Sequence, residues 1–132
     1  VIRKNDKQVT SLDLSQLQLH SNQILEILEL LWTHNNYIRS VNFCGNEKIT
    51  LGVIRSIANV KALGQLAGKR LTHLNLSHCG LGNEGFRQLL IQTSAGKWKD
   101  LDLSYNGITT LCGDDEKDLI TKHIKNLEAL NL

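Results

Sequence analysis

Apolar residues recur along the chain in one short pattern, apolar-x-x-apolar-x-apolar, which occurs five times. The last three positions of each copy alternate apolar and polar, as is typical of a short β-strand with one buried face. The copies are Val9-Leu12-Leu14, Ile38-Val41-Phe43, Leu71-Leu74-Leu76, Trp98-Leu101-Leu103 and Leu127-Leu130-Leu132. Their starts lie 29, 33, 27 and 29 residues apart, so the sequence predicts a chain built from internal repeats.

Between these strands the apolar spacing changes to that of an amphipathic helix. The apolar stripes are Ile24-Leu25-Ile27-Leu28-Leu31, Ile54-Ile57-Val60-Leu63, Phe86-Leu89-Leu90 and Leu119-Ile120-Ile124. Short polar residues near the helix starts are candidate N-caps, because their side chains can accept hydrogen bonds from free amide groups. These candidates are Ser21, Thr50, Asn83 and Asp114.

A short polar side chain is expected to hold the turn that follows each strand. The third residue after the pattern is Asn46, Cys79 or Asn106 in three units, whereas the first unit has Leu17 there. A small side chain of this kind can bond backbone groups that are left unpaired where the chain turns from strand to helix.

Two segments, LTHLNLSHCGLGNEGF (71–86) and WKDLDLSYNGITTL (98–111), resemble leucine-rich repeats of the ribonuclease-inhibitor-like class. The resemblance implies an α/β fold, a curved leucine-rich-repeat solenoid that forms a right-handed superhelix with parallel strands on its concave face and helices on its convex face. It implies a single domain over residues 1–132, with units starting near 9, 38, 71 and 98 and a partial unit at 127. We expect this domain to be a fragment of a longer protein.

In such a fold the polar strand residues line the concave face, and we expect that face to bind a protein partner. Tyr105, His73, His78 and Arg39 are the expected main contacts, because interfaces draw much of their energy from aromatic and arginine side chains. The full set of candidate partner-binding residues is Arg39, Asn42, His73, Asn75, His78, Asp100, Asp102 and Tyr105. Asp100 and Asp102 would suit a basic group of the partner. The alternative is that these residues are only the polar surface that any solvent-facing strand shows.

Proteins with similar repeats include intracellular immune sensors, ribonuclease inhibitors, actin-filament regulators and bacterial effectors. The expected function is therefore a protein–protein interaction module, as part of a bacterial effector or an intracellular sensor. The alternative is a structural or regulatory segment of a larger protein with no binding role of its own. Self-association through an uncapped C-terminal end is a further expectation.

Catalysis, cofactors and metal binding are not expected. Cys44 with His73 or His78 could in principle form a nucleophile pair or part of a zinc site, but no catalytic or metal-binding motif accompanies these residues. With 15 basic and 13 acidic residues, the net charge of +2 is too even to favour nucleic acid. No apolar run is long enough for membrane insertion. The three cysteines show no disulfide pattern, which favours a cytoplasmic location, or a host-cell cytoplasm for a secreted effector.

Overall fold

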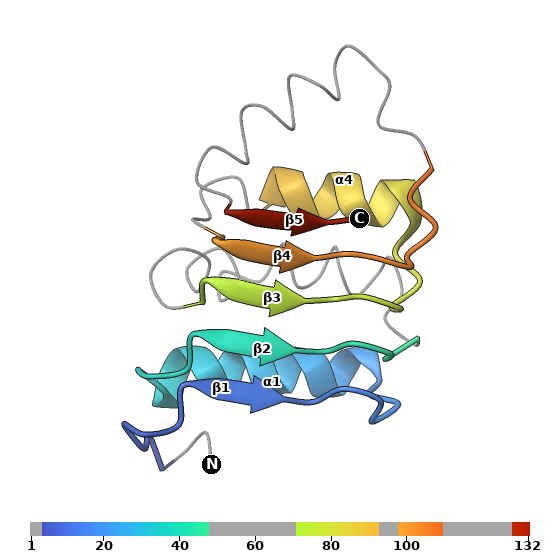
Figure 1. Ribbon diagram of the computed structural model, residues 1–132. Helices are drawn as coiled ribbons and strands as arrows, with labels where there is room; N and C mark the ends of the chain where they lie inside the picture. The colour runs from blue at the N-terminus through green and yellow to red at the C-terminus, as the bar shows by residue number, and fades with distance from the viewer. Residues whose placement is uncertain (1–3, 48–70, 93–97, 110–127) are drawn as a thin grey trace.

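The computed structural model describes residues 4–47, 71–92, 98–109 and 128–132, and these form five strands and two helices (Figure 1). The strands are β1 (Ser11–Asp13), β2 (Ser40–Asn42), β3 (His73–Asn75), β4 (Asp100–Asp102) and β5 (Ala129–Asn131). The helices are α1 (Ser21–His34) and α4 (Gly82–Gln92). Each strand lies within one copy of the apolar pattern, as the sequence predicts.

The strands form one parallel sheet in the order β1-β2-β3-β4-β5, so every strand pairs with the strand of the next unit. The register aligns the middle apolar residue of each copy across the whole sheet. This row is Leu12, Val41, Leu74, Leu101 and Leu130. A shift of one residue would turn the apolar row to the solvent side, so the pattern itself fixes the register.

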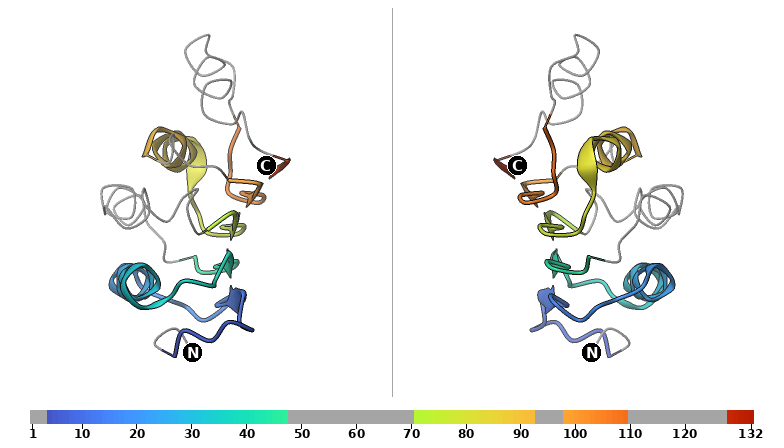
Figure 2. Two further views of the ribbon diagram at one scale, coloured as in Figure 1. Left: turned by 90° about the vertical axis from the view of Figure 1, so that its left-hand side faces the viewer. Right: turned by 90° about the vertical axis from the view of Figure 1, so that its right-hand side faces the viewer.

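Both helices lie on the same side of the sheet, and the core fills the space between the two layers (Figure 2). Helix α1 buries Ile24, Leu28 and Leu31, and helix α4 buries Phe86, Leu89 and Leu90. These are residues of the predicted stripes, so the helical periodicity is confirmed for both helices. The stripes at 54–63 and 119–124 lie outside the described residues.

The predicted helix N-caps were wrong, by one residue for α1 and by two residues for α4. Helix α1 has its N-cap at His20, whose backbone N–H donates to Gln23 Oε1 at 2.9 Å, so Ser21 is already helical. Helix α4 begins at Gly82, which places Asn83 in its first turn. The Asn83 side chain instead bonds Thr109, accepting from its backbone N–H at 2.7 Å and donating to its hydroxyl at 3.1 Å. The candidates Thr50 and Asp114 lie outside the described residues.

The predicted turn-holding role is confirmed for Asn46 and Asn106. Asn46 donates to the carbonyls of Leu14 (2.9 Å) and Phe43 (2.7 Å) and accepts from the N–H of Leu19 (2.9 Å). Asn106 is 4% exposed and bonds the unit before it in the same way. It donates to the Leu76 and Leu103 carbonyls and accepts from the amides of Cys79 and Leu81. Each asparagine therefore closes its own turn and the turn of the preceding unit.

The described residues thus give a five-stranded parallel sheet with two helices on one side. This description does not show the curved leucine-rich-repeat solenoid that was expected from the sequence. The physical reason is that the repeated pattern specifies strand pairing and turn bonds, which are local, and leaves the larger architecture open.

Candidate functional site

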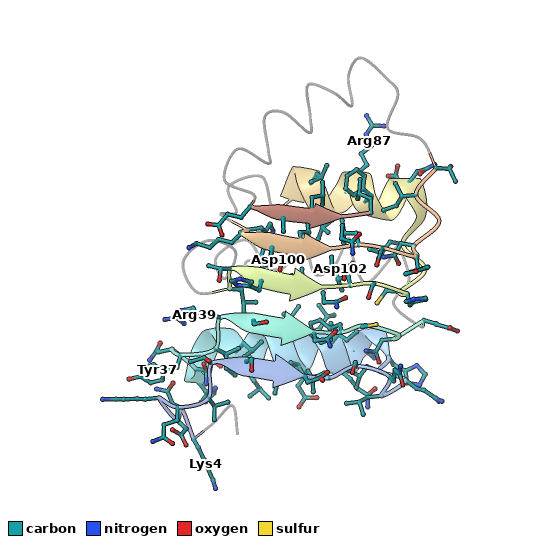
Figure 3. The ribbon with its side chains drawn as sticks, viewed as in Figure 1. Lys4, Tyr37, Arg39, Arg87, Asp100 and Asp102 are labelled. Carbon is teal, nitrogen blue, oxygen red and sulfur yellow. The ribbon has the colours of Figure 1, made fainter. Side chains whose placement is uncertain are left out.

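The side of the sheet away from the helices carries the polar strand residues, and we call it the open sheet face. It consists of the first and third residue of each strand: Ser11, Asp13, Ser40, Asn42, His73, Asn75, Asp100, Asp102, Ala129 and Asn131. The two aspartates of β4 project from this face in Figure 3. It is the surface on which most of the predicted binding residues lie.

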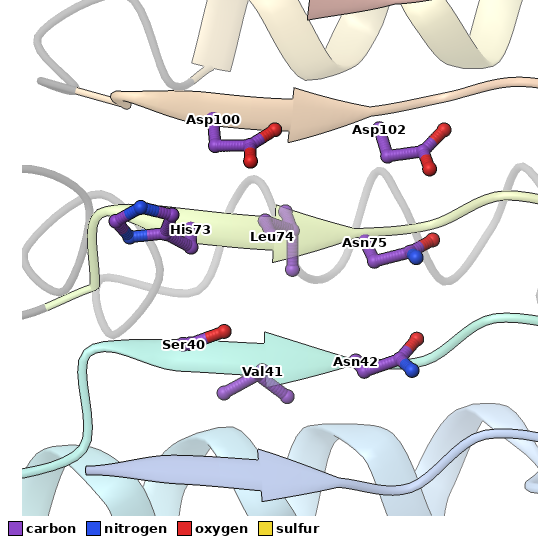
Figure 4. Close-up of a pocket in the computed structure, with 8 residues that line it drawn as sticks. All are labelled: Ser40, Val41, Asn42, His73, Leu74, Asn75, Asp100 and Asp102. Atoms are coloured by element: carbon purple, nitrogen blue, oxygen red, sulfur yellow. The ribbon is translucent and has the colours of Figure 1, made fainter. Parts of the chain in front are cut away.

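A pocket of about 290 Å³ lies over the middle of the open sheet face (Figure 4). Its polar walls are Ser40 and Asn42 of β2, His73 and Asn75 of β3, and Asp100 and Asp102 of β4. Val41 and Leu74, whose side chains are buried, complete the lining. The structure thus brings five of the eight predicted residues together. Ser40, which lies in register with His73, also lines the pocket but was not among the eight predicted binding residues.

In each of the first four strands, the third residue lies on this face and also forms a hydrogen bond that stabilises the following turn. Asp13, Asn42, Asn75 and Asp102 each accept, through Oδ1, the backbone N–H of the residue two positions later, at 2.9–3.0 Å. This Asx turn ends the strand. The two bonds from Ser15 hold the pKa of Asp13 below its usual value. The side chains of Asn42, Asn75 and Asp102 are therefore held in fixed orientations.

The charges around the pocket are unevenly placed. Arg39 does not reach the pocket, because its guanidinium donates to the carbonyls of Asn36 (2.7 Å) and Ile38 (3.2 Å) at the amino end of β2 (Figure 3). Lys99 pairs with Glu128 at 3.8 Å. Asp100 and Asp102 have no ion-pair partner among the described residues. The lining of the pocket therefore carries two carboxylates that no cation neutralises in the part of the chain the structure describes.

Two predicted residues, His78 and Tyr105, form an aromatic stack at the carboxyl edge of the sheet. Their ring centroids are 4.3 Å apart and their planes differ by 13°. The spacing follows from the fold, since neighbouring strands lie about 4.8 Å apart and the two residues occupy equivalent positions in adjacent units. Tyr105 is 76% exposed, the most exposed large apolar side chain of the described residues.

The backbone that carries this stack is strained. His78 and Tyr105 have φ of 53° and 56°, in the left-handed region. Gly45, the equivalent residue of the preceding unit, has φ of 72°, and a Cβ there would lie 3.0 Å from Gln16 Cγ. Left-handed backbone costs a residue other than glycine roughly 1 kcal/mol. Two aromatic residues therefore occupy positions that favour glycine.

Cys44 does not pair with His73. The register places Ser40, four residues before Cys44, opposite His73, and four residues of strand span about 13 Å. In the part of the chain that the structure describes, no three histidine, cysteine or acidic side chains come together as a metal site.

A second hollow, of about 480 Å³, was not foreseen from the sequence. It lies beyond the carboxyl ends of β1 and β2 and is lined by Gln16, Gln18, Gly45 and Glu47. Its lining belongs to turns that the apolar pattern leaves unspecified.

Neither described helix has the length and apolar character needed to cross a bilayer.

No protein-family model and no curated protein matches the chain. Solved structures do match. One, described as the tropomodulin C-terminal domain from Caenorhabditis elegans, has a TM-score of 0.75 at 14% identity and covers 99% of this chain and 77% of its own. Another, described as leiomodin-1 actin-binding site 2, has a TM-score of 0.70 at 15% identity, and the match covers 98% of this chain and 73% of the leiomodin-1 chain.

These matches correct the family that the sequence suggested. The resemblance to the ribonuclease-inhibitor-like class of leucine-rich repeats was wrong, and so was the solenoid architecture that it implied. The misleading signal was local, because a short strand and an asparagine-bonded turn depend on a few neighbouring residues and do not identify a family. The chain has a fold similar to that of the tropomodulin C-terminal domain and of leiomodin-1 actin-binding site 2.

Proposed function

We propose that the chain binds a protein partner through the open sheet face and the adjoining His78–Tyr105 stack. The stack is the observation that carries the proposal. Exposed aromatic side chains on a rigid frame are the groups from which interfaces draw most energy. Here they occupy left-handed backbone, at a cost of roughly 1 kcal/mol each, where glycine would be free of strain. Gln16 has the same left-handed backbone, with φ of 55°, at the equivalent position of the first unit, so the aromatic side chains are what distinguish His78 and Tyr105.

The rigidity of the face supports the same proposal. Asx turns hold Asn42, Asn75 and Asp102, and the stack holds the two rings, so few side chains would lose freedom on docking. Pre-ordered side chains save about 0.5–1.5 kcal/mol each on association.

Actin is the first partner to test. The leiomodin-1 structure that this fold resembles is described as an actin-binding site. The suggestion rests on that likeness of fold, at 15% identity, together with the aromatic rim of this chain. The narrower roles of bacterial effector and immune sensor depended on the leucine-rich-repeat resemblance and are not carried forward.

Co-sedimentation with actin filaments tests the proposal. We expect the chain to pellet with filaments, and Tyr105→Ala to weaken the affinity about tenfold or more, in the range of an interface hot spot. The matched control is Arg87→Ala, because Arg87 is an exposed residue of α4, away from the open sheet face. If Arg87→Ala weakened pelleting as much as Tyr105→Ala, the binding surface would not be the open sheet face.

The alternative is a structural segment that binds nothing. It would be favoured if neither filaments nor a cell lysate yielded a partner whose binding Tyr105→Ala abolishes.

We also propose that the chain is not an enzyme and that it acts in a reducing compartment, which the free thiols of Cys44 and Cys79 support. Cys44→Ser should leave partner binding unchanged, whereas a cysteine-dependent enzyme would lose its activity.

A further inference from the structure

The pocket on the open sheet face has an electrostatic character that the proposed function does not explain. The chain as a whole carries a net charge of +2, yet the charged groups among the described residues that line the pocket are Asp100 and Asp102. Among the described residues, the cations near the pocket are turned away from it or paired, as Arg39 donates to backbone carbonyls and Lys99 contacts Glu128. The histidine in the lining, His73, has its Nδ1 2.8 Å from the hydroxyl of Thr72.

The two carboxylates present free oxygen atoms to the pocket. Asp102 uses Oδ1 for its bonds to Ser104 (3.0 Å to the amide and 2.7 Å to the hydroxyl), which leaves Oδ2 available. The Asp100 carboxylate has no hydrogen bond to another described residue, and Asp100 is exposed. The remaining polar walls, from Ser40, Asn42 and Asn75, can accept hydrogen bonds from a donor-rich group.

The spacing of the carboxylates is set by the strand. Asp100 and Asp102 are alternate residues of β4 and point to the same face, so they lie about 7 Å apart. An extended peptide repeats its side chains on one face at the same interval. Tyr105, three residues farther along, offers an exposed ring to which a guanidinium can stack.

We propose that the occupant of this pocket is an extended segment of the partner protein that carries arginine side chains at alternate positions. The guanidinium groups would lie against Asp100 and Asp102 between β3 and β4. Arginine suits the site better than lysine, because its planar group forms paired hydrogen bonds with carboxylates and stacks on aromatic rings. The inference rests on the proposed function, since it names the chemistry of the partner at the same face.

The test is an NMR titration of the isotopically labelled chain with two short peptides. One probe is acetyl-Arg-Gly-Arg-amide, and the other has both arginines replaced by citrulline, which keeps the shape and removes the charge. We expect the arginine peptide to bind at least fivefold more tightly and to shift the amide signals of β3 and β4. Asp100→Asn with Asp102→Asn should reduce its affinity to that of the citrulline peptide.

The variants are chosen to preserve the fold. Asparagine can form the Asx turn of Asp102, as Asn75 does in the adjacent unit. Asp13→Asn is the control, because it removes one charge from an equivalent position on β1 that does not line the pocket. It should leave the preference for arginine unchanged.

Three results would overturn the inference: equal binding of the two peptides, no detectable binding of either, or a preference for arginine that survives the double substitution. Its failure can be told apart from failure of the proposed function. If only this inference fails, Tyr105→Ala still weakens co-sedimentation with filaments while the two peptides bind alike. If only the choice of actin as partner fails, the chain does not pellet while the arginine preference remains.

Discussion

At the scale of single residues, Cys79 shows how one repeat position accepts different chemistry. It occupies the place of Asn46 and Asn106 but is fully buried, with Sγ 3.3 Å from the Phe43 carbonyl and 3.4 Å from that of Ser77. Burial, which disfavours the thiolate, raises the pKa of this thiol from its ordinary 9.0 to about 11. The thiol should therefore be protonated and unreactive in the folded protein at neutral pH.

Because of this pKa shift, we expect the free energy of unfolding to fall as the pH rises into the alkaline range. The unfolded chain loses the Cys79 proton near pH 9, whereas the folded chain keeps it until about pH 11. The stabilisation by the protonated thiol is complete below pH 9 and is lost as the pH rises toward 11, by up to about 2 kcal/mol. Urea unfolding at several pH values should show a steeper decline for wild type than for Cys79→Ala, which removes this group from the comparison. Equal slopes would contradict the expectation.

At the scale of elements, the buried asparagines connect each strand-to-helix turn with the unit before it. The Asn106 side chain bonds five backbone groups at 2.7–3.3 Å. Two are carbonyls of its own unit, those of Leu103 and Ser104. The other three belong to the preceding unit and are the Leu76 carbonyl and the amides of Cys79 and Leu81. Strands of three residues have few ladder bonds of their own, so these side-chain bonds are a substantial share of what fixes each turn.

Asn106→Ala should therefore be costly. It leaves the Cys79 and Leu81 amides and the Leu76 carbonyl without this partner in a buried region, and each buried polar group left unpaired costs about 1–3 kcal/mol. We expect the free energy of unfolding to fall by about 3 kcal/mol, as measured by urea denaturation. The control is Asn22→Ala at an exposed site in α1, which should change stability by less than about 0.5 kcal/mol. Similar losses for both variants would argue against the bridging role.

At the scale of the whole molecule, burial decreases from the middle of the sheet toward β1 and β5. In the shared apolar row, Val41, Leu74 and Leu101 are buried, whereas Leu12 and Leu130 are only partly buried. Each outer strand also pairs with a single neighbour among the described strands. Local opening should therefore be easier at the two outer strands than in the middle.

Amide hydrogen exchange followed by NMR checks this gradient. The Phe43 and Leu76 amides donate to the neighbouring central strands, and the Leu14 and Ala129 amides belong to the outer ones. We expect the first pair to exchange at least tenfold more slowly than the second, because their bonds open only with the central sheet. Uniform protection across all four amides would mean that the sheet opens as one unit.

The sequence predicted the local parts of this fold better than the larger ones. The strand positions, the register and the roles of Asn46 and Asn106 could be predicted because each depends on alternation or on one short side chain. The helix starts could not be predicted, because they depend on individual side-chain hydrogen bonds. The His20 N–H donates to Gln23 Oε1, and the Asn83 side chain bonds Thr109. The family was wrong because the repeated pattern is local.

The candidate site was partly foreseen for the same reason. Strand alternation places Asn42, His73, Asn75, Asp100 and Asp102 on one face, and the pocket gathers all five. The fixed rotation of Arg39 toward Asn36, and the left-handed backbone under His78 and Tyr105, depend on turns that the pattern does not specify. Whether these residues bind a partner stays a prediction that the proposed experiments test.

The backward reach of the asparagines has a consequence for synthesis on the ribosome. Asn46 satisfies groups that emerge 27 and 32 residues earlier, and Asn106 satisfies groups that emerge 25 to 30 residues earlier. We therefore expect the turn of a newly made unit to lack these side-chain hydrogen bonds until most of the next unit has left the exit tunnel. Nascent chains arrested between these points should remain sensitive to protease at the last turn made and become resistant one unit later.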